Sequence, residues 1–551
     1  MLRRRFLPLL TFGPSLVRAQ KTDRSHGRSM VIASGGIVST SQVLASQAGA
    51  MILAQGGSAV DAAITANAVL GVVEPMMCGI GGDLFVMYRE AKTGQITGLN
   101  ASGGAPRGMT IAALQAKGLK KMTPTGIHSV TVPGCVRGWQ AMHRRHGKLA
   151  WNKLFDPAIR FAASGFPMQE MVGRVWNSEL VRKDPEGVRV FYPKGKAPEV
   201  GEIFRNPDLA GAMRLIADEG ADAFYKGDIA TAILMKSQKL GGLLSAPDLA
   251  NFEPEWVAPI ATTYRGWQVY ELPPNGQGLA ALSMLNILEN FDPAPPFSST
   301  ELHRKIEAMK LAYADLKYVA DTRVTKVPTQ SLIAKPYAAQ RAKLIKADRA
   351  NCAVEAGTQS VSSDTTYFTV VDAEGNIASW IQSVSGSWAS GVPVDGMGFH
   401  LHNRGGGFSF DASQPNALAP GKRPFHTIIP AIMQKGDLHI GFGIMSGANQ
   451  PLAHAQFVSN IADHGMNLQA ALEAPRFTKS RASGCDVTIE SRFGLETLRE
   501  LSSKGHQITI AQPYSARMGR GNAVMHNAKT KVNTAASDPR ADGAAIPQPE
   551  Q

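Results

Sequence analysis

Hydrophobic residues recur at helical spacing near the start of the chain. Between Ser41 and Ala54 the apolar positions follow a period close to that of an α-helix, which predicts an amphipathic helix. Gly56-Gly57 interrupts the pattern, and Ser58–Val73 predicts a second helix whose small alanine side chains permit close packing. The glycine-rich stretch Cys78–Asp83 predicts a turn, and Leu84–Tyr88 predicts a strand after it.

The pattern changes in the second half of the chain. Residues 107–350 are mostly helical in pattern, most clearly over Leu302–Val319. Asn351–Asp364 is polar, small and aperiodic, which is typical of a loop. Strands are predicted over Thr365–Val371 and Ile377–Ile381, and the turn sequence DAEGN between them indicates a hairpin.

Short strands and glycine turns continue to about Ile444, and Leu452–His464 predicts a further helix. The tail Ala535–Gln551 is rich in Ala and Pro and has the composition of a low-complexity segment. Helices, a loop, strands and again helices, in this order, are typical of a layered α+β fold.

Composition supports a folded chain and excludes several classes of protein. The 551 residues are 44% hydrophobic and 18% charged, which excludes disorder for most of the chain. No apolar run reaches the ~18 residues of a membrane-spanning helix. The cysteines lack C-x-x-C spacing, so neither a disulfide-built scaffold nor a cysteine zinc site is expected. They are Cys78, Cys135, Cys352 and Cys485.

The formal net charge is +13, but the basic residues are dispersed along the chain and aromatic residues make up only 7% of it. A nucleic-acid-binding surface would concentrate Lys and Arg on one element, so no nucleic-acid partner is expected. A soluble basic protein is the simplest interpretation, and electrostatic steering of anionic substrates is an alternative.

The first twenty residues have the pattern of an export signal. Arg3-Arg4-Arg5 precedes an apolar stretch from Phe6 to Val17, and Val17-Arg18-Ala19 has the form of a cleavage site. The start also fits R-R-x-F-L, the shape of a twin-arginine signal. Residues 1–19 are therefore expected to direct the protein to the periplasm or the exterior, where a disulfide is permissible. A frayed basic N-terminus is the alternative.

Most familiar catalytic motifs are absent. The sequence contains no G-x-S-x-G, no H-E-x-x-H and no phosphate-binding G-x-x-x-x-G-K-[ST]. His400 and His402 would share one face of a strand, but a polar strand face explains them better than a metal site. The glycine clusters at 79–82 and 405–407 are better explained as tight turns than as phosphate loops. No metal and no cofactor are expected.

Thr365 stands at the boundary between the predicted loop and strand. A Thr pair there is explained by strand propensity alone. However, if the chain were cut between Asp364 and Thr365, Thr365 would gain an α-amine with a pKa of about 7.7–8.0. That amine could accept the proton of the hydroxyl of the same residue, so nucleophile and base would come from one residue without a histidine.

The sequence around Thr365 resembles the start of the small subunit in γ-glutamyltranspeptidases, which are N-terminal-nucleophile hydrolases. The resemblance covers roughly residues 30–545, in six separated segments in the same order. These are 56–85, 271–289, 303–321, 364–376 (DTTYFTVVDAEGN), 418–432 (LAPGKRPFHTIIPAI) and 535–545. The resemblance implies a four-layer αββα sandwich and a precursor that cleaves itself into a heterodimer. Its large subunit would comprise residues 20–364 and its small subunit residues 365–551.

The resemblance also implies roles for the residues of the catalytic centre. Thr365 would be the nucleophile and, through its amine, the general base. The second hydroxyl of the family, which binds that amine, falls at Ser383, and the Asn two residues later falls at Ser385. The oxyanion hole, a Gly-Gly pair in the family, falls at Ser446-Gly447; backbone N–H groups form it, so a serine is compatible with that role.

The residues that would hold a γ-glutamyl group depart from the family. The Arg that binds the α-carboxylate falls at Ser102, and the Gln and Asp that bind the α-amine fall at Arg404 and Gly407. The Ser-Ser pair falls at His426-Thr427. These positions form the substrate clamp. Relative to the family, the clamp has lost the cation that would bind the α-carboxylate and has gained a cation beside the α-amine. Arg404 would meet a carboxylate on an acyl chain that lacks the amine, such as glutaryl, or would face a structural acid.

Three functions follow from these residues. The first is a self-processing γ-glutamyltransferase-like amidohydrolase that acts on a small-molecule amide and passes the acyl group to water or to an amine. The second is a cephalosporin-acylase-like enzyme that removes a dicarboxylic acyl group from a bulky amine, which the altered clamp favours. The third, from another class, is an inert binding protein on the same fold; the retained Thr365 argues against it.

Overall fold

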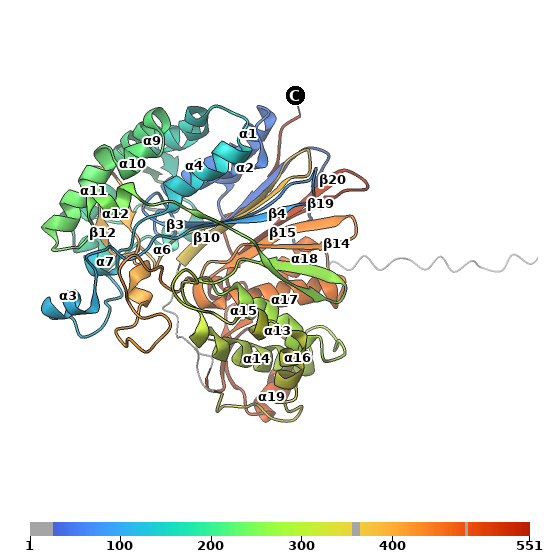
Figure 1. Ribbon diagram of the computed structural model, residues 1–551. Helices are drawn as coiled ribbons and strands as arrows, with labels where there is room; N and C mark the ends of the chain where they lie inside the picture. Colours follow the sequence, from blue (N-terminus) through green and yellow to red (C-terminus); the bar gives the residue numbers. More distant parts are fainter. Residues whose placement is uncertain (1–25, 355–363, 480–482, 551) are drawn as a thin grey trace, which may run out of the picture.

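The computed structural model describes residues 26–354, 364–479 and 483–550. The predicted export signal, residues 1–19, and most of the predicted loop at 351–364 lie outside these residues. Within the described part, two seven-stranded antiparallel sheets face each other, and helices cover the outer face of each (Figure 1). This arrangement confirms the predicted α+β class and the four-layer αββα sandwich.

Each sheet is assembled from strands that lie far apart in the sequence. The order in the first sheet is β1 (Val31–Ala33), β20 (Val532–Ser537), β19 (Arg520–Asn527), β15 (Leu438–Met445), β14 (Ala431–Lys435), β9 (Trp267–Glu271) and β8 (Ile260–Tyr264). The order in the second sheet is β21 (Ala544–Pro547), β2 (Ile37–Thr40), β10 (Asp364–Val371), β11 (Ile377–Ser385), β3 (Asp83–Arg89), β4 (Ile96–Ala101) and β7 (Glu255–Val257). Strands from before and after residue 364 are therefore neighbours in both sheets.

Two groups of helices form the outer layers (Figure 1). The layer over the second sheet contains α1 (Val43–Ala54), α2 (Ala59–Val73), α4 (Cys135–His146), α5 (Asp156–Ser164), α9 (Pro207–Glu219), α10 (Asp222–Tyr225) and α11 (Asp228–Lys239). The layer over the first sheet contains α13 (Gly278–Leu288), α14 (Ser299–Ala314), α16 (Lys335–Ala342), α17 (Gln450–Ala462), α18 (Leu468–Glu473) and α19 (Leu495–Ser503).

Shorter elements complete the chain. The remaining helices are α3 (Ile111–Ala116), α6 (Glu170–Val175), α7 (Glu179–Arg182), α8 (Pro185–Phe191), α12 (Ala246–Ala250) and α15 (Thr329–Leu332). The remaining strands are β5 (Phe166–Pro167), β6 (Ile203–Phe204), β12 (Val392–Pro393), β13 (His400–Leu401), β16 (Phe477–Thr478), β17 (Asp486–Glu490) and β18 (Gln507–Ala511).

The second helix, α2, lies against the centre of the sandwich. Every residue of it is buried, because α1 and α4 cover it on one side and β10 and β11 lie on the other. Ser58 caps its first turn: the Ser58 hydroxyl accepts from the Asp61 N–H, and the Asp61 carboxylate accepts from the Ser58 N–H. Its alanine-rich sequence permits this close packing, as the pattern predicted.

The two sheets approach closely where β10 faces β15. Phe85, Tyr367, Ile381 and Ile432 fill the space between them and are fully buried. A Cβ atom on Gly443 of β15 would lie 2.4 Å from the ring of Tyr367, so only glycine permits this contact. The close approach fixes the position of β10, whose first residues carry the candidate nucleophile.

Most elements predicted from the sequence are confirmed, and one prediction is wrong. The segment 107–350 is mostly helical, as predicted, and it also contributes β7, β8 and β9 to the ends of the two sheets. The tail at 535–551 is not a low-complexity extension, because it completes β20 and forms β21. Small Ala side chains suit these strands: Ala535 and Ala536 are buried between neighbouring layers.

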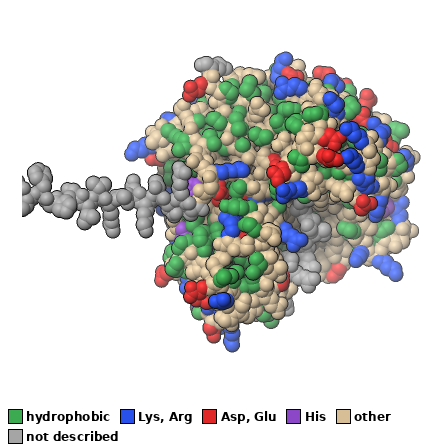
Figure 2. All heavy atoms as spheres, turned by 180° about the vertical axis from the view of Figure 1, so that it is seen from behind, with side chains coloured by type: hydrophobic (Ala, Val, Ile, Leu, Met, Phe, Trp, Pro, Cys, Tyr) green, Lys and Arg blue, Asp and Glu red, His purple; other side chains and the backbone are tan. Residues whose placement is uncertain are grey.

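Charged side chains of both signs are interspersed on the face shown in Figure 2, in agreement with the dispersed basic residues of the sequence. In the described part of the chain, no helix is both long and apolar enough to cross a membrane.

The cysteines divide into a bonded pair and two thiols. Cys352 and Cys485 form a disulfide across 133 residues, a pairing that the spacing could not identify. Cys78 and Cys135 are free and buried in the helical layer over the second sheet. The fold is thus cross-linked once within the described residues, while its two large hydrophobic cores supply most of the packing.

Candidate active site

Thr365 lies at the start of the central strand β10. The pairing of β10 with β11 shifts register between Asp364 and Thr366, so Thr365 sits in a bulge of the ladder. The residue is only 2% exposed, and its Oγ1 donates to Oγ of Ser383 on the neighbouring strand at 3.2 Å. The hairpin predicted from the sequence therefore brings together the two hydroxyls that were expected to act together.

Ser383 is a hub of hydrogen bonds. Besides the Thr365 hydroxyl, its Oγ accepts from the backbone N–H of Ser385 at 2.8 Å and from Nη2 of Arg404 at 3.4 Å. Ser385 has a φ of 80°, and this left-handed turn aims its N–H back at Ser383. Ser385 thus contacts Ser383 through its backbone, and a contact of its side chain with substrate stays a prediction.

Arg404 is a buried cation beside the nucleophile. It is 5% exposed, and Nη1 donates to the Thr427 hydroxyl at 2.9 Å. Within the described part of the chain its Nε has no hydrogen-bond partner, and no carboxylate lies within 4.0 Å of its guanidinium. Burial lowers the pKa of Arg404 to about 10, so the side chain remains charged at neutral pH. The charge of Asp83 opposes the effect of burial on the pKa of Arg404, so the alternative in which Arg404 faces a structural acid stays open beside the contact with a substrate carboxylate.

His426 and Thr427 belong to one loop but point to different partners. Thr427 receives Arg404, whereas His426 is fully buried and its Nε2 donates to Asp83 at 3.0 Å. Burial and the charge of Arg404 lower the pKa of His426 to about 3, so the ring is neutral. Burial alone would raise the pKa of Asp83, but His402 and His426 hold it well below its usual range. His426 therefore binds a residue of the protein.

Two glycines bring the predicted turn at 78–83 against this region. A Cβ on Gly81 would lie 2.2 Å from the carbonyl oxygen of His400, and a Cβ on Gly82 would lie 2.4 Å from that of Ser383. The cluster at 79–82 thus serves close backbone packing, as expected for a tight turn, and it positions Asp83 behind His426.

Ser446 and Gly447 follow β15 directly and have unusual backbones, with φ values of 140° and 51°. Among the described residues neither N–H donates a hydrogen bond to another group, while the Ser446 carbonyl accepts from Asn449. Two adjacent unused N–H groups are what an oxyanion hole requires. The two N–H groups are therefore available to a substrate oxyanion, and the oxyanion role of Ser446 and Gly447 stays a prediction.

Gln277, just before α13, is a residue that sequence reasoning missed. Its Nε2 donates to the carbonyls of Thr427 at 2.6 Å and of Gly447 at 2.9 Å. One side chain thus joins the loop that holds Arg404 to the loop of the proposed oxyanion hole. The only signal in the sequence is a polar residue directly ahead of a mostly apolar helix, within a segment that resembles the family.

Glu74 was also missed. It is fully buried beneath Thr366 and accepts from the hydroxyls of Ser41 at 2.8 Å and Thr366 at 3.2 Å. Burial raises the pKa of Glu74, so this carboxyl group takes up a proton more readily than a solvent-exposed one. It supports the strand next to Thr365 from the end of α2.

Ser102 is not joined to these groups. Its hydroxyl donates to Asn100 Oδ1 at 2.8 Å and accepts from Asn275 Nδ2 at 3.2 Å, and the residue is fully buried. No described hydrogen bond connects it to Thr365, Ser383 or Arg404. The structure therefore shows Ser102 in an internal network, and its predicted contact with substrate stays a prediction.

One further cluster could in principle bind a metal ion. His303, Glu307 and His506 bring three possible ligand atoms within 4.8 Å of one another. However, Lys310 donates to Glu307 at 2.7 Å, and the two imidazoles are hydrogen-bonded to each other at 2.8 Å. These groups satisfy one another, and an ammonium beside the cluster disfavours a cation there.

An αββα sandwich that carries a buried threonine at the start of a central strand, hydrogen-bonded to a second hydroxyl, is the architecture of the N-terminal-nucleophile hydrolases. The family model described as Gamma-glutamyltranspeptidase matches residues 45–548, and the chain belongs to that family.

Named relatives support the same assignment. The chain is 36% identical over 530 residues to the glutathione hydrolase-like YwrD proenzyme of Bacillus subtilis (strain 168), which covers 94% of this chain and 99% of that protein. It is 32% identical over 528 residues to the acylase ACY 1 proenzyme of Pseudomonas sp. (strain SE83), covering 93% of each.

Among solved structures, the cephalosporin acylase from Bacillus halodurans matches with a TM-score of 0.89 and 38% identity, over 98% of this chain and 100% of that one. The protein is accordingly an enzyme, a γ-glutamyltranspeptidase-like amidohydrolase, with the acylase activity as the alternative. All three of these relatives are named as enzymes, so the inert binding protein finds no support among them.

Proposed function

We propose that this enzyme hydrolyses amides whose acyl group ends in a carboxylate, through an ester on Thr365 that can form only after the chain has cut itself. The cut would fall between Asp364 and Thr365 and would give a large subunit of residues 20–364 and a small subunit of residues 365–551. Two of the similar proteins are named as proenzymes, which supports this processing.

Self-cleavage would begin with attack of Thr365 Oγ1 on the carbonyl carbon of Asp364. The Asp364–Thr365 C–N bond breaks as the new C–O ester bond forms, and the nitrogen becomes the α-amine of Thr365. Water then hydrolyses the ester, which leaves a carboxylate on Asp364 and returns the proton to Oγ1. The bulge at Thr365 supports this step, because it frees the residue from regular pairing with β11.

Turnover would use the same hydroxyl. The α-amine takes the proton of Thr365 Oγ1 as the oxygen attacks the amide carbonyl, and the N–H groups of Ser446 and Gly447 stabilise the oxyanion. The α-amine then gives that proton to the departing amine, and the acyl group remains on Oγ1 as an ester. Water releases the acid; an amine acceptor in place of water would give transfer.

The observation that carries the substrate class is Arg404. A buried guanidinium with no carboxylate within 4.0 Å among the described residues, linked through Ser383 to the nucleophile, favours a substrate that supplies a carboxylate. A γ-glutamyl group would bring its ammonium to this side of the pocket. Two cations at ~4 Å repel by roughly 1–4 kcal/mol, depending on the local dielectric. Glutathione is therefore expected to be a poor substrate, and a glutaryl-type acyl group a better one.

The experiment compares glutaryl and γ-glutamyl 4-nitroanilides in steady state. We expect a higher kcat/KM for the glutaryl compound, because its chain brings a carboxylate without the amine. A γ-glutamyl anilide that is more than tenfold better would contradict the substrate assignment and favour the γ-glutamyl activity of the family. Mass spectrometry of the trapped enzyme should find the acyl group on Thr365.

Thr365→Ala tests the mechanism separately from the substrate. The variant lacks the attacking oxygen, so it should remain one chain on a reducing gel and should show no turnover of either anilide. Thr366→Ala is the matched control, because it removes the neighbouring hydroxyl, which contacts Glu74 and Ser41, and keeps the attacking oxygen of Thr365. Active wild-type enzyme that remains a single uncut chain would overturn the proposed mechanism.

Export to the periplasm or the exterior is part of this proposal. The arginine-rich start of the chain supports it, as does the Cys352–Cys485 disulfide, because disulfides persist in oxidising compartments. Replacing both Arg3 and Arg4 with Lys should leave the protein in the cytoplasmic fraction. Unchanged export of that variant would exclude the twin-arginine route.

A further inference from the structure

We propose that the Cys352–Cys485 disulfide becomes a covalent link between the two subunits of the mature enzyme. The inference rests on the proposed cleavage between Asp364 and Thr365, because Cys352 precedes that bond and Cys485 follows it. The loop closed by the disulfide in the precursor contains the bond that is cut. Scission therefore opens the loop but leaves the two products joined through sulfur.

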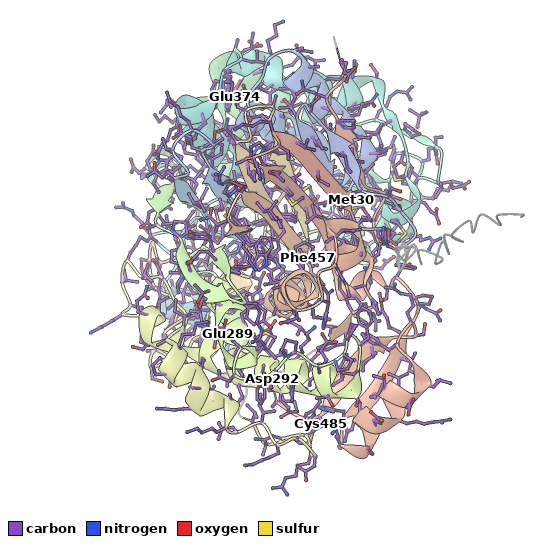
Figure 3. The ribbon with its side chains drawn as sticks, turned by 90° about the vertical axis from the view of Figure 1, so that its right-hand side faces the viewer. Met30, Glu289, Asp292, Glu374, Phe457 and Cys485 are labelled. Carbon is purple, nitrogen blue, oxygen red and sulfur yellow. A yellow bond between two sulfur atoms is a disulfide. The ribbon has the colours of Figure 1, made fainter. Side chains whose placement is uncertain are left out.

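The cross-link lies in a lobe at one end of the molecule. Figure 3 shows Cys485 at the opposite end of the view from Glu374, which lies in the turn between β10 and β11. Cys485 immediately precedes β17, a strand of the small sheet beside α19. The link thus holds a part of the molecule that lies apart from the two large sheets.

Hydrogen bonds across the future subunit boundary surround the disulfide. The Gly484 N–H donates to the Cys352 carbonyl at 3.1 Å, and the Ala350 N–H donates to the Lys504 carbonyl at 2.7 Å. Lys310 of α14 lies 3.8 Å from the sulfur of Cys485. These contacts keep the two cysteines together, with Cα atoms 4.9 Å apart, independently of the peptide bond at 364–365.

The link has a physical consequence for a cleaved enzyme. Two chains held only by non-covalent contacts separate when they unfold, so their stability and their refolding depend on protein concentration. A disulfide keeps the unfolded subunits together at a high effective concentration and restricts the unfolded ensemble. Unfolding of the tethered enzyme is therefore independent of concentration, and the activity recovers after dilution from denaturant.

Paired electrophoresis of mature wild-type enzyme, alkylated before denaturation, tests the link. The expected result is two bands with reductant and one band of the combined mass without it. Two bands on both gels would overturn the link while leaving the proposed cleavage intact. One band on both gels would overturn the cleavage, and the link with it, so the two failures are distinguishable.

A variant lacking both cysteines, Cys352→Ser with Cys485→Ala, tests the consequence. It should show two bands without reductant, a melting temperature that falls as the protein is diluted, and poor recovery of activity from dilute denaturant. Cys135→Ala is the matched control, because it removes a buried thiol that forms no disulfide. If the double variant fails to fold, wild-type enzyme that has been reduced and alkylated without denaturant replaces it. If that enzyme recovers as much activity from denaturant as the unreduced enzyme does, the proposed benefit of the disulfide for refolding is overturned.

Discussion

Two regions of this molecule bury arginine side chains in opposite ways. Arg540 is fully buried, and each of its three nitrogens donates to an acceptor: Nε and Nη2 to Glu490 at 2.8 Å, and Nη1 to Asp538 at 3.0 Å. Arg404 is similarly buried, yet among the described residues it donates to two neutral hydroxyls and its Nε finds no partner. The first arrangement is complete without a ligand, whereas the second leaves a cation that a ligand carboxylate could neutralise.

The largest expected effect is a loss of stability when Arg540 is removed from its cluster with Glu490 and Asp538. Arg540→Met should lower the free energy of unfolding by about 3–5 kcal/mol, because Glu490 and Asp538 lose a buried partner. Calorimetry of the variant measures this loss. Arg492→Met is the control: Arg492 binds Glu490 at 2.6 Å, but its side chain is 21% exposed, so its removal should cost less. If both variants lose the same free energy of unfolding, the deeper burial of Arg540 does not make its ion pairs more important for stability.

The second prediction concerns Arg404 and its effect on turnover. Arg404→Gln should lower kcat/KM for a glutaryl anilide by roughly 10- to 100-fold, the range of a hydrogen bond to a charged group, without lowering the melting temperature. The mutation removes a buried charge that has no ion pair among the described residues, so we expect no loss of stability. Steady-state kinetics and calorimetry check both parts.

Arg89→Gln is the matched control for that change. Arg89 is also 5% exposed and without a described ion pair, but it lies at the opposite end of β3 from Asp83. Its replacement should leave the preference for glutaryl over γ-glutamyl anilide unchanged. A similar loss of preference in both variants would mean that Arg404 acts through general electrostatics and not by contact.

A buried histidine extends the comparison of the buried arginines, because a histidine without a partner can stay neutral whereas an arginine stays charged. Neither ring nitrogen of His400 has a partner among the described residues, and burial lowers its pKa to about 4. The unfolded chain takes up this proton below pH ~6.5, so the folded state loses stability as the pH falls from 6.5 to 4. His400→Phe should remove this loss, a gain of about 3 kcal/mol at pH 4.

Melting temperatures of wild type and His400→Phe between pH 8 and pH 4 test this. At pH 8 the two proteins differ only in packing against Trp388 and Phe191, so that point serves as the internal control. A difference that stays constant over the whole range would show that the ring of His400 does not resist protonation.

The smallest expected effect extends the comparison from side chains to the backbone. Ser446 has a φ of 140°, a conformation that costs a non-glycine residue about 1 kcal/mol or more. Ser446→Gly should therefore raise the free energy of unfolding by about 1 kcal/mol and leave kcat unchanged, because the N–H remains. Ala448→Gly, at a position without positive φ, should instead be destabilising. A loss of kcat in Ser446→Gly would show that the serine side chain takes part in turnover.

Sequence reasoning reached the local features of the fold and missed the pairings made over long distances. The hairpin around Thr365–Ile381 could be predicted because strand periodicity and turn residues are adjacent in the chain. The edge strands β7 and β21 could not, since their pairing partners lie far away in sequence and the strands are only three and four residues long. The Cys352–Cys485 pair was beyond prediction for the same reason.

The candidate site shows the same division. Thr365, Ser383 and Arg404 were expected together, and the structure joins them by hydrogen bonds. Gln277 could not be identified from its own sequence context, because its importance comes from two carbonyl groups on loops about 150 and 170 residues away. The hydrogen bond of His426 to Asp83 could not be predicted either, because Asp83 lies 343 residues earlier, and the predicted contact of His426 with substrate stays a prediction.

The interleaving of strands from both sides of residue 364 bears on how such an enzyme can be produced. A gene beginning at Thr365 would encode β10 and β11 without β2 and β3, the strands that flank them. Neither half could then mature as an independent module. Recombination or gene splitting at this point would succeed only where both pieces are synthesised together and find each other before either aggregates.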